Sequence, residues 1–144
     1  VRCFCFFVVA KFIGGRVFYA VRVDTSSGFE LCPADACRTE QEDAFCPTGD
    51  SGGAPGRFQI LNSDERPPQA LLSAYEKFLK GSQIHIAGIE FIVDRNGEAW
   101  TYDVNTNTNY NSDAEATAGR FGMGAIAEYL GKELAALMST AATV

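Results

Sequence analysis

The sequence predicts an α+β domain in which helices pack on a mostly antiparallel sheet. Two segments, residues 1–23 and 84–104, each hold two runs of β-branched and aromatic residues separated by a glycine-containing turn, the pattern of a β-hairpin. Two others, residues 69–79 and 114–138, carry apolar residues three and four positions apart, as amphipathic helices do. With 144 residues, of which 47% are hydrophobic, the chain fits one domain spanning residues 1–144.

The first hairpin turns at Gly14-Gly15, and the returning strand alternates in a way that predicts one core-facing side. The apolar run that opens the chain is about half as long as the roughly 20 residues a bilayer span needs, so we interpret it as a strand rather than a signal peptide or a membrane segment. The absence of an initiating Met suggests a fragment. Arg22 interrupts the returning strand and needs a partner, which solvent or Asp24 could supply.

Residues 25–57 form a long irregular stretch that contains three of the five cysteines. A zinc site made of Cys32, Cys37, Cys46 and His85 is disfavoured, because the chain has no C-x-x-C pair and His85 is distant in sequence. An odd number of cysteines also fits poorly with a disulfide framework. We therefore expect reduced cysteines and a cytoplasmic protein.

The same stretch holds Gly49-Asp50-Ser51-Gly52-Gly53, a string similar to the one around the nucleophile of trypsin-like serine proteases. The only histidine follows Ser51 instead of preceding it, and 144 residues are too few for two six-stranded barrels. We interpret the string as a flexible loop.

A short strand at residues 58–61 and a turn ending in Pro67-Pro68 precede the first predicted helix. Gly81 follows its end, and we expect its apolar stripe to be core: Leu71, Leu72, Tyr75, Phe78 and Leu79.

The second hairpin places oxygen-bearing side chains where core residues would be expected. With a turn at residues 95–97, Glu90 pairs with Asp103, and Asn105 points to the same side as Asp103. Facing carboxylates repel unless one is protonated or a cation lies between them, and Mg²⁺ takes carboxylate and amide oxygens. The alternative is a solvent-facing Glu90 on a one-sided sheet, followed by a polar loop.

After Asn105 the polar residues 106–111 have the character of a ligand-binding loop. Ser112-Asp113 can cap a helical region over residues 114–138. We expect its glycines to break it, and its apolar side to consist of Phe121, Met123, Ile126, Ala127, Tyr129, Leu130, Leu134 and Leu137.

Gly88-Ile89-Glu90-Phe91, an acidic residue thirteen positions after Glu90, and the string DVNTN at residues 103–107 together resemble the magnesium-binding end of the ATP-grasp superfamily. The longer string TYDVNTNTNYN, followed by an Ala/Glu-rich helix, is similar to glutamate-ligase-like ATP-grasp proteins. The resemblance implies the fold of an ATP-grasp C-terminal subdomain.

By that resemblance Glu90, Asp103 and Asn105 bind Mg²⁺ or Mn²⁺ on the phosphates of ATP. Asn107 would hold the loop or reach a phosphate oxygen, and Arg22 would contact a nucleotide phosphate or the acyl phosphate. Two positions depart from the pattern: Lys11-Phe12 stands where Glu-Phe is expected, and Tyr110 where relatives often have Gly after Pro.

The resemblance implies an ATP- and Mg²⁺-dependent carboxylate-amine ligase that forms an acyl phosphate, with ATP, a carboxylate and an amine as its partners. It covers only the later half of the catalytic unit, so we expect the isolated chain to be inactive. The net charge of -6 and the lack of Lys/Arg runs argue against a nucleic-acid partner. The alternatives are a non-catalytic nucleotide- or partner-binding module of the same fold, and a structural domain indifferent to divalent ions.

Overall fold

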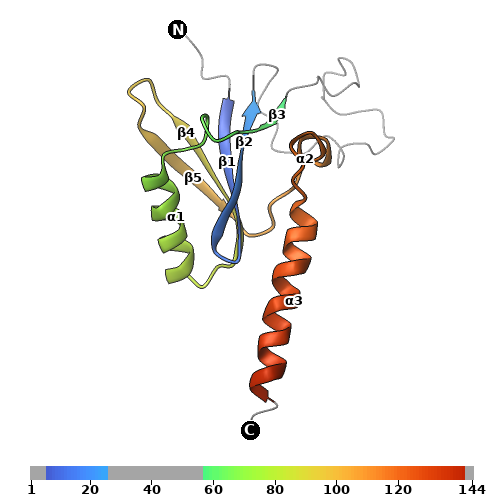
Figure 1. The fold of residues 1–144 in the computed structure, drawn as a ribbon. Helices are drawn as coiled ribbons and strands as arrows, with labels where there is room; N and C mark the ends of the chain where they lie inside the picture. Colours follow the sequence, from blue (N-terminus) through green and yellow to red (C-terminus); the bar gives the residue numbers. More distant parts are fainter. Residues whose placement is uncertain (1–5, 26–56, 142–144) are drawn as a thin grey trace, which may run out of the picture.

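The computed structural model describes residues 6–25 and 57–141 and confirms the α+β class. In that part of the chain, five strands form one antiparallel sheet with the order β3-β2-β1-β4-β5, and three helices accompany it (Figure 1). The elements are β1 (Phe6–Ile13), β2 (Arg16–Asp24), β3 (Phe58–Ile60), α1 (Gln69–Gly81), β4 (Ile86–Val93), β5 (Ala99–Asn105), α2 (Ser112–Ala118) and α3 (Gly122–Ala141).

Both predicted hairpins are confirmed, and their turns explain their registers. Gly14 and Gly15 have φ angles of 64° and 69°, which a two-residue turn with two left-handed positions requires. In the β4-β5 turn the Asp94 carboxylate accepts the backbone N–H groups of Asn96 and Glu98, and Gly97 adopts a φ of 83°. These local contacts fix the alignment of β4 with β5.

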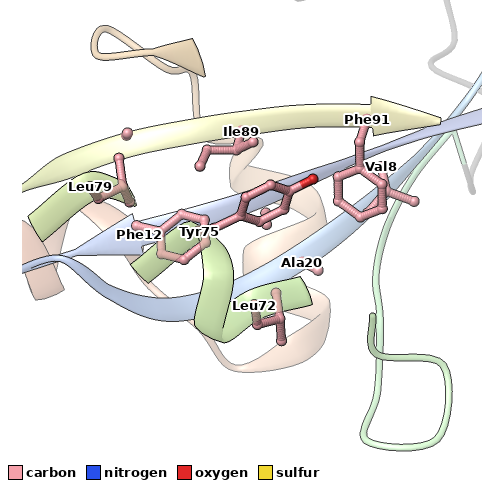
Figure 2. Close-up of a cluster of buried hydrophobic side chains, with 10 residues drawn as sticks. Val8, Phe12, Ala20, Leu72, Tyr75, Leu79, Ile89 and Phe91 are labelled. Carbon is pink, nitrogen blue, oxygen red and sulfur yellow. The ribbon is translucent and has the colours of Figure 1, made fainter. Parts of the chain in front are cut away.

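One face of the sheet is closed by α1, whose buried residues Leu72, Tyr75 and Leu79 point into the strands (Figure 2). The Tyr75 ring lies between Phe12 and Phe91, with ring centroids 6.3 and 5.9 Å away. The predicted stripe is wrong at Phe78, which is 50% exposed because it lies at the edge of the helix's apolar arc. This face is a continuous apolar core.

The opposite face carries a second apolar cluster, formed by Phe7, Val9, Tyr19, Val21 and Val23. The chain that follows β5 covers part of it, because Tyr110 packs edge-on against Tyr19 at 6.5 Å and Glu115 of α2 contacts the Tyr19 hydroxyl. The sheet is therefore covered on both faces, by α1 on one and by the segment after β5 on the other (Figure 1).

The region predicted as one interrupted helix is two helices with a single break. Gly119 ends α2 in the left-handed conformation, with φ 62° and ψ 33°. The breaks expected at Gly122, Gly124 and Gly131 are wrong, since all three lie within α3, where a single glycine costs about 1 kcal/mol and is tolerated.

The predicted N-cap is also displaced by one residue. Asn111, in extended conformation, caps α2 by accepting the Ala114 backbone N–H at 2.8 Å, whereas Ser112 and Asp113 lie inside the helix. The cap must precede the first helical residue, and the sequence offers three successive capping types.

The apolar side of α3 does not pack on the sheet as expected. Its 20 residues extend about 30 Å, past the end of the sheet (Figure 1). Tyr129 is the residue that reaches the β1-β2 turn, since a Cβ on Gly14 would lie 3.0 Å from its ring. The exposed apolar residues are Met123, Leu130, Leu134, Leu137 and Met138. None of the helices that the structure describes is long and apolar enough to cross a membrane.

Leu72→Ala is expected to lower the free energy of unfolding by about 2–5 kcal/mol, because it opens a cavity in the fully buried core under α1. Leu137→Ala is the matched control: that leucine is 69% exposed on α3, and its removal should change the free energy by no more than about 0.5 kcal/mol. Urea unfolding of the two variants measures both values. Equal losses would contradict the placement of the core.

Candidate metal and phosphate site

The strand pairing arranges the candidate ligands in two cross-strand rows on one face of the sheet. The first, here the Glu90 row, contains Val21, Val9, Glu90 and Asp103. The second, here the Lys11 row, contains Tyr19, Lys11, Gly88 and Asn105. Residues two apart on a strand share a face, so both rows lie opposite α1. The predicted pairing of Glu90 with Asp103, and the shared face of Asp103 and Asn105, are confirmed.

A β-bulge re-aims the side chains of β5 next to Glu90. Glu90 pairs with Asp103 while Phe91 pairs with Thr101, so Tyr102 is the extra residue of the bulged strand. Its hydroxyl donates to Glu90 Oε2 at 3.0 Å. Burial and the nearby Glu90 and Asp103 carboxylates raise the pKa of Tyr102, which keeps the phenol protonated. Sequence reasoning missed Tyr102, because it has the pattern of an ordinary strand aromatic.

Asn105 ends β5 and turns the chain back. Its Oδ1 accepts the backbone N–H of Asn107 at 2.8 Å, an Asx-turn that starts the loop of residues 106–111. The amide oxygen keeps a second lone pair for another partner. The side chain of Asn107 is exposed, and its predicted contact with a phosphate stays a prediction.

The candidate donors are carboxylate and amide oxygens, the types that a hard divalent cation prefers. Glu90 keeps Oε1 beside the oxygen that Tyr102 contacts, Asp103 is exposed, and Asn105 adds a neutral carbonyl. A cation between the two facing carboxylates would relieve their repulsion. Residues 6–25 and 57–141 contain no group of three or more His, Cys, Asp or Glu side chains that could hold a metal ion. The candidate set contains only two acids, with an amide as its third member.

Lys11 lies on the same face and is only 5% exposed. Its Nζ donates to the Thr108 hydroxyl and, at 2.7 Å, to the Asn109 carbonyl, and lies 5.4 Å from the centre of the Tyr110 ring. Burial lowers the pKa of Lys11 to about 8, against the opposing attraction of the Glu90 and Glu115 carboxylates. The sequence marked this position only as a departure from Glu-Phe.

Glu115 is the second buried charged group on this side of the sheet. It accepts the Tyr19 hydroxyl at 2.6 Å and the Gly122 backbone N–H at 3.0 Å. A Cβ on Gly122 would lie 2.3 Å from the Tyr110 ring, so α3 must begin with glycine here. No signal in the sequence singled out Glu115, whose position in a short Ala-rich helix reads as solvent-facing.

Arg22 lies on the other face of the sheet. It pairs with Val8 and Gln59, donates to Gln59 Oε1 and lies 3.9 Å from a Glu65 carboxylate oxygen. Val8 belongs to the core under α1, so the structure does not bring Arg22 together with Glu90. Its role as a phosphate contact stays a prediction.

The disfavoured zinc set is only partly described. His85 Nδ1 shares a 2.8 Å hydrogen bond with the Tyr129 hydroxyl, and the two rings stack with centroids 6.1 Å apart. Cys32, Cys37, Cys46 and the Ser51 string lie outside the described residues.

Comparison with protein-family models gives no match for this chain. Comparison with curated proteins gives none either.

Lys11→Met is expected to change how stability depends on pH. The folded-state pKa of about 8 lies below the ordinary 10.5, so between these values the unfolded chain binds more protons and the wild type gains stability as pH rises. From pH 7.5 to 9.5 that gain is up to about 2 kcal/mol relative to Lys11→Met.

Urea unfolding at the two pH values measures the gain. Lys132→Met, which removes an exposed lysine from α3, is the control and should follow the wild type. Equal pH slopes in the wild type and Lys11→Met would show that Lys11 is not buried as a titrating group.

Proposed function

We propose that this chain provides the Mg²⁺- and nucleotide-phosphate-binding end of an ATP-grasp carboxylate-amine ligase. The observation that carries the proposal is the register of β4 and β5, in which Glu90 lies directly opposite Asp103 and Asn105 follows on the same face. The resemblance of residues 88–107 to the magnesium-binding end of that superfamily supplies the reaction class. An antiparallel sheet backed by a helix is compatible with that assignment.

The proposed reaction has two balanced steps. A substrate carboxylate oxygen attacks the γ-phosphorus of ATP, the bond to the bridging oxygen breaks, and acyl phosphate and ADP result. An amine nitrogen then attacks the acyl carbon, inorganic phosphate leaves, and the nitrogen loses a proton to give the amide. Mg²⁺, when bound, neutralises negative charge on the phosphoryl group during the first step.

The residues of this chain would bind and orient. Glu90 and Asp103 would bring two negative charges to the cation, and Asn105 a neutral oxygen of the kind Mg²⁺ accepts. The Tyr102 hydroxyl holds one oxygen of Glu90, which restricts the rotamers of that carboxylate and orients the other oxygen. Asn107, exposed at the start of the loop, is the proposed phosphate contact.

A partner-binding module of the same fold is the second candidate, and one observation favours it. The exposed leucines and methionines of α3 present apolar side chains to solvent, as interaction surfaces do. Such a module needs no divalent cation, so dependence on the cation separates the two candidates.

Binding of Mn²⁺, which stands in for Mg²⁺, tests the proposal. With a non-hydrolysable ATP analogue present, binding to the wild-type chain should enhance the relaxation of water protons by Mn²⁺ beyond the value measured for Mn²⁺ and the analogue without protein. Asp103→Asn should weaken it by at least about 10-fold, because ligand charge sets the affinity of oxygen sites.

Glu98→Gln is the matched control, since Glu98 is an exposed carboxylate in the turn of the same hairpin. It should bind Mn²⁺ as the wild type does. Binding that survives Asp103→Asn unchanged would exclude this face as the metal site, and a wild type that binds no Mn²⁺ would favour the partner-binding module.

A further inference from the structure

The Lys11 row has a gap that another part of the chain fills. Gly88 stands between Lys11 and Asn105 in the pairing of the three strands and has no side chain. A Cβ built on Gly88 would lie 2.4 Å from the Thr108 hydroxyl oxygen and 2.9 Å from Thr108 Cβ. Thr108 therefore occupies the space above Gly88, between Lys11 and Asn105.

The contacts of Lys11 end on this loop. Its buried ammonium group needs acceptors, because an unpaired buried charge is costly. The acceptors are the Thr108 hydroxyl and the Asn109 carbonyl, and the Tyr110 ring lies beside Nζ. Lys11 thus binds three successive residues of the segment that leaves β5.

We infer that Lys11 is a positioning residue: by holding Thr108 over Gly88 and binding the Asn109 carbonyl, it keeps residues 105–109 against the face that carries Glu90 and Asp103. The inference rests on the proposed function, because the role concerns that metal site. Lys11 acts through Thr108 and bonds to none of the three proposed ligands.

Two anchors hold the segment. The Asx-turn from Asn105 to the Asn107 N–H fixes its first residues, and the Lys11 contacts fix Thr108 and Asn109. Without the Lys11 contacts, the sheet would hold the loop only at Tyr110, which packs on Tyr19, and Thr108 and Asn109 would lose their hydrogen bonds to β1. The path of residues 105–109 across this face of the sheet therefore depends in part on a lysine of β1.

Removing the Thr108 acceptor while leaving the Lys11 charge in place tests the role. Thr108→Val keeps the shape of the side chain and should weaken binding of Mn²⁺ with the ATP analogue by about 10-fold, at the lower end of the cost of removing a group that supports metal ligands. Thr108→Ser restores the hydroxyl and should restore affinity. A merely space-filling role for Thr108 predicts the reverse order, since valine fills the site and serine does not.

A second pair of variants moves the loop without touching its residues. Gly88→Ala places a methyl group where Thr108 lies and should reproduce the loss of Mn²⁺ affinity seen with Thr108→Val. Gly124→Ala is the control. The nearest atom to the added Cβ would be the Cβ of Phe121 at 3.8 Å, which is an ordinary van der Waals contact.

Amide hydrogen exchange of residues 106–110 in the ligand-free chain gives a readout without metal. Exchange should be faster in Thr108→Val and at the wild-type rate in Thr108→Ser. If Thr108→Val leaves either the exchange rates or the Mn²⁺ affinity unchanged, the positioning role of Lys11 is overturned and the proposed function is not affected. A wild-type chain that binds no Mn²⁺ would overturn the proposed function and this role with it.

Discussion

Two buried charged side chains, Lys11 and Glu115, tie the segment after β5 to the sheet. Lys11 has its acceptors in the loop, and Glu115 has its donors in Tyr19 of β2 and at the start of α3. Neither charge can lose these partners without the desolvation cost of an unpaired buried group, several times the net value of an ordinary hydrogen bond. The path of the chain from Asn105 to Gly122 follows from satisfying both.

Both faces of the sheet have an apolar cluster, but buried charged side chains lie on only one of them in the part of the chain that the structure describes. Under α1 the contacts are apolar, so they depend on volume and tolerate many side chains that fill it. On the other face the apolar cluster is joined by directed hydrogen bonds, which Tyr102 and Lys11 donate and Glu115 accepts, and these fix positions. The proposed metal site would require fixed oxygens, and the face with these directed contacts is the one that carries Glu90 and Asp103. Arg22 lies on the packing face, with Gln59 and Glu65.

Sequence reasoning predicted the parts of this structure that depend on residues close together in the chain. Glycine turns gave both hairpins, and counting outward from one turn gave the pairing of Glu90 with Asp103. What it missed depends on pairs distant in sequence: the lysine contact with Thr108 spans 97 positions, and the Tyr19 contact with Glu115 spans 96. The exposed side of α3 shows the same limit, since an apolar periodicity indicates a face to be covered without showing what covers it.

Lys11 stands where the resemblance to ATP-grasp proteins implies a glutamate, and its contacts explain why a lysine suits this structure. The Asn109 carbonyl can only accept hydrogen bonds, so it suits an ammonium group and would repel a carboxylate at the same place. A glutamate there would also join Glu90 and Glu115, whose charges act on this position, and with Asp103 on the same face it would be the fourth negative charge there. The lysine and the loop's acceptors are therefore mutually consistent. In the structure, Lys11 therefore takes part in holding the loop beside the Glu90 and Asp103 carboxylates.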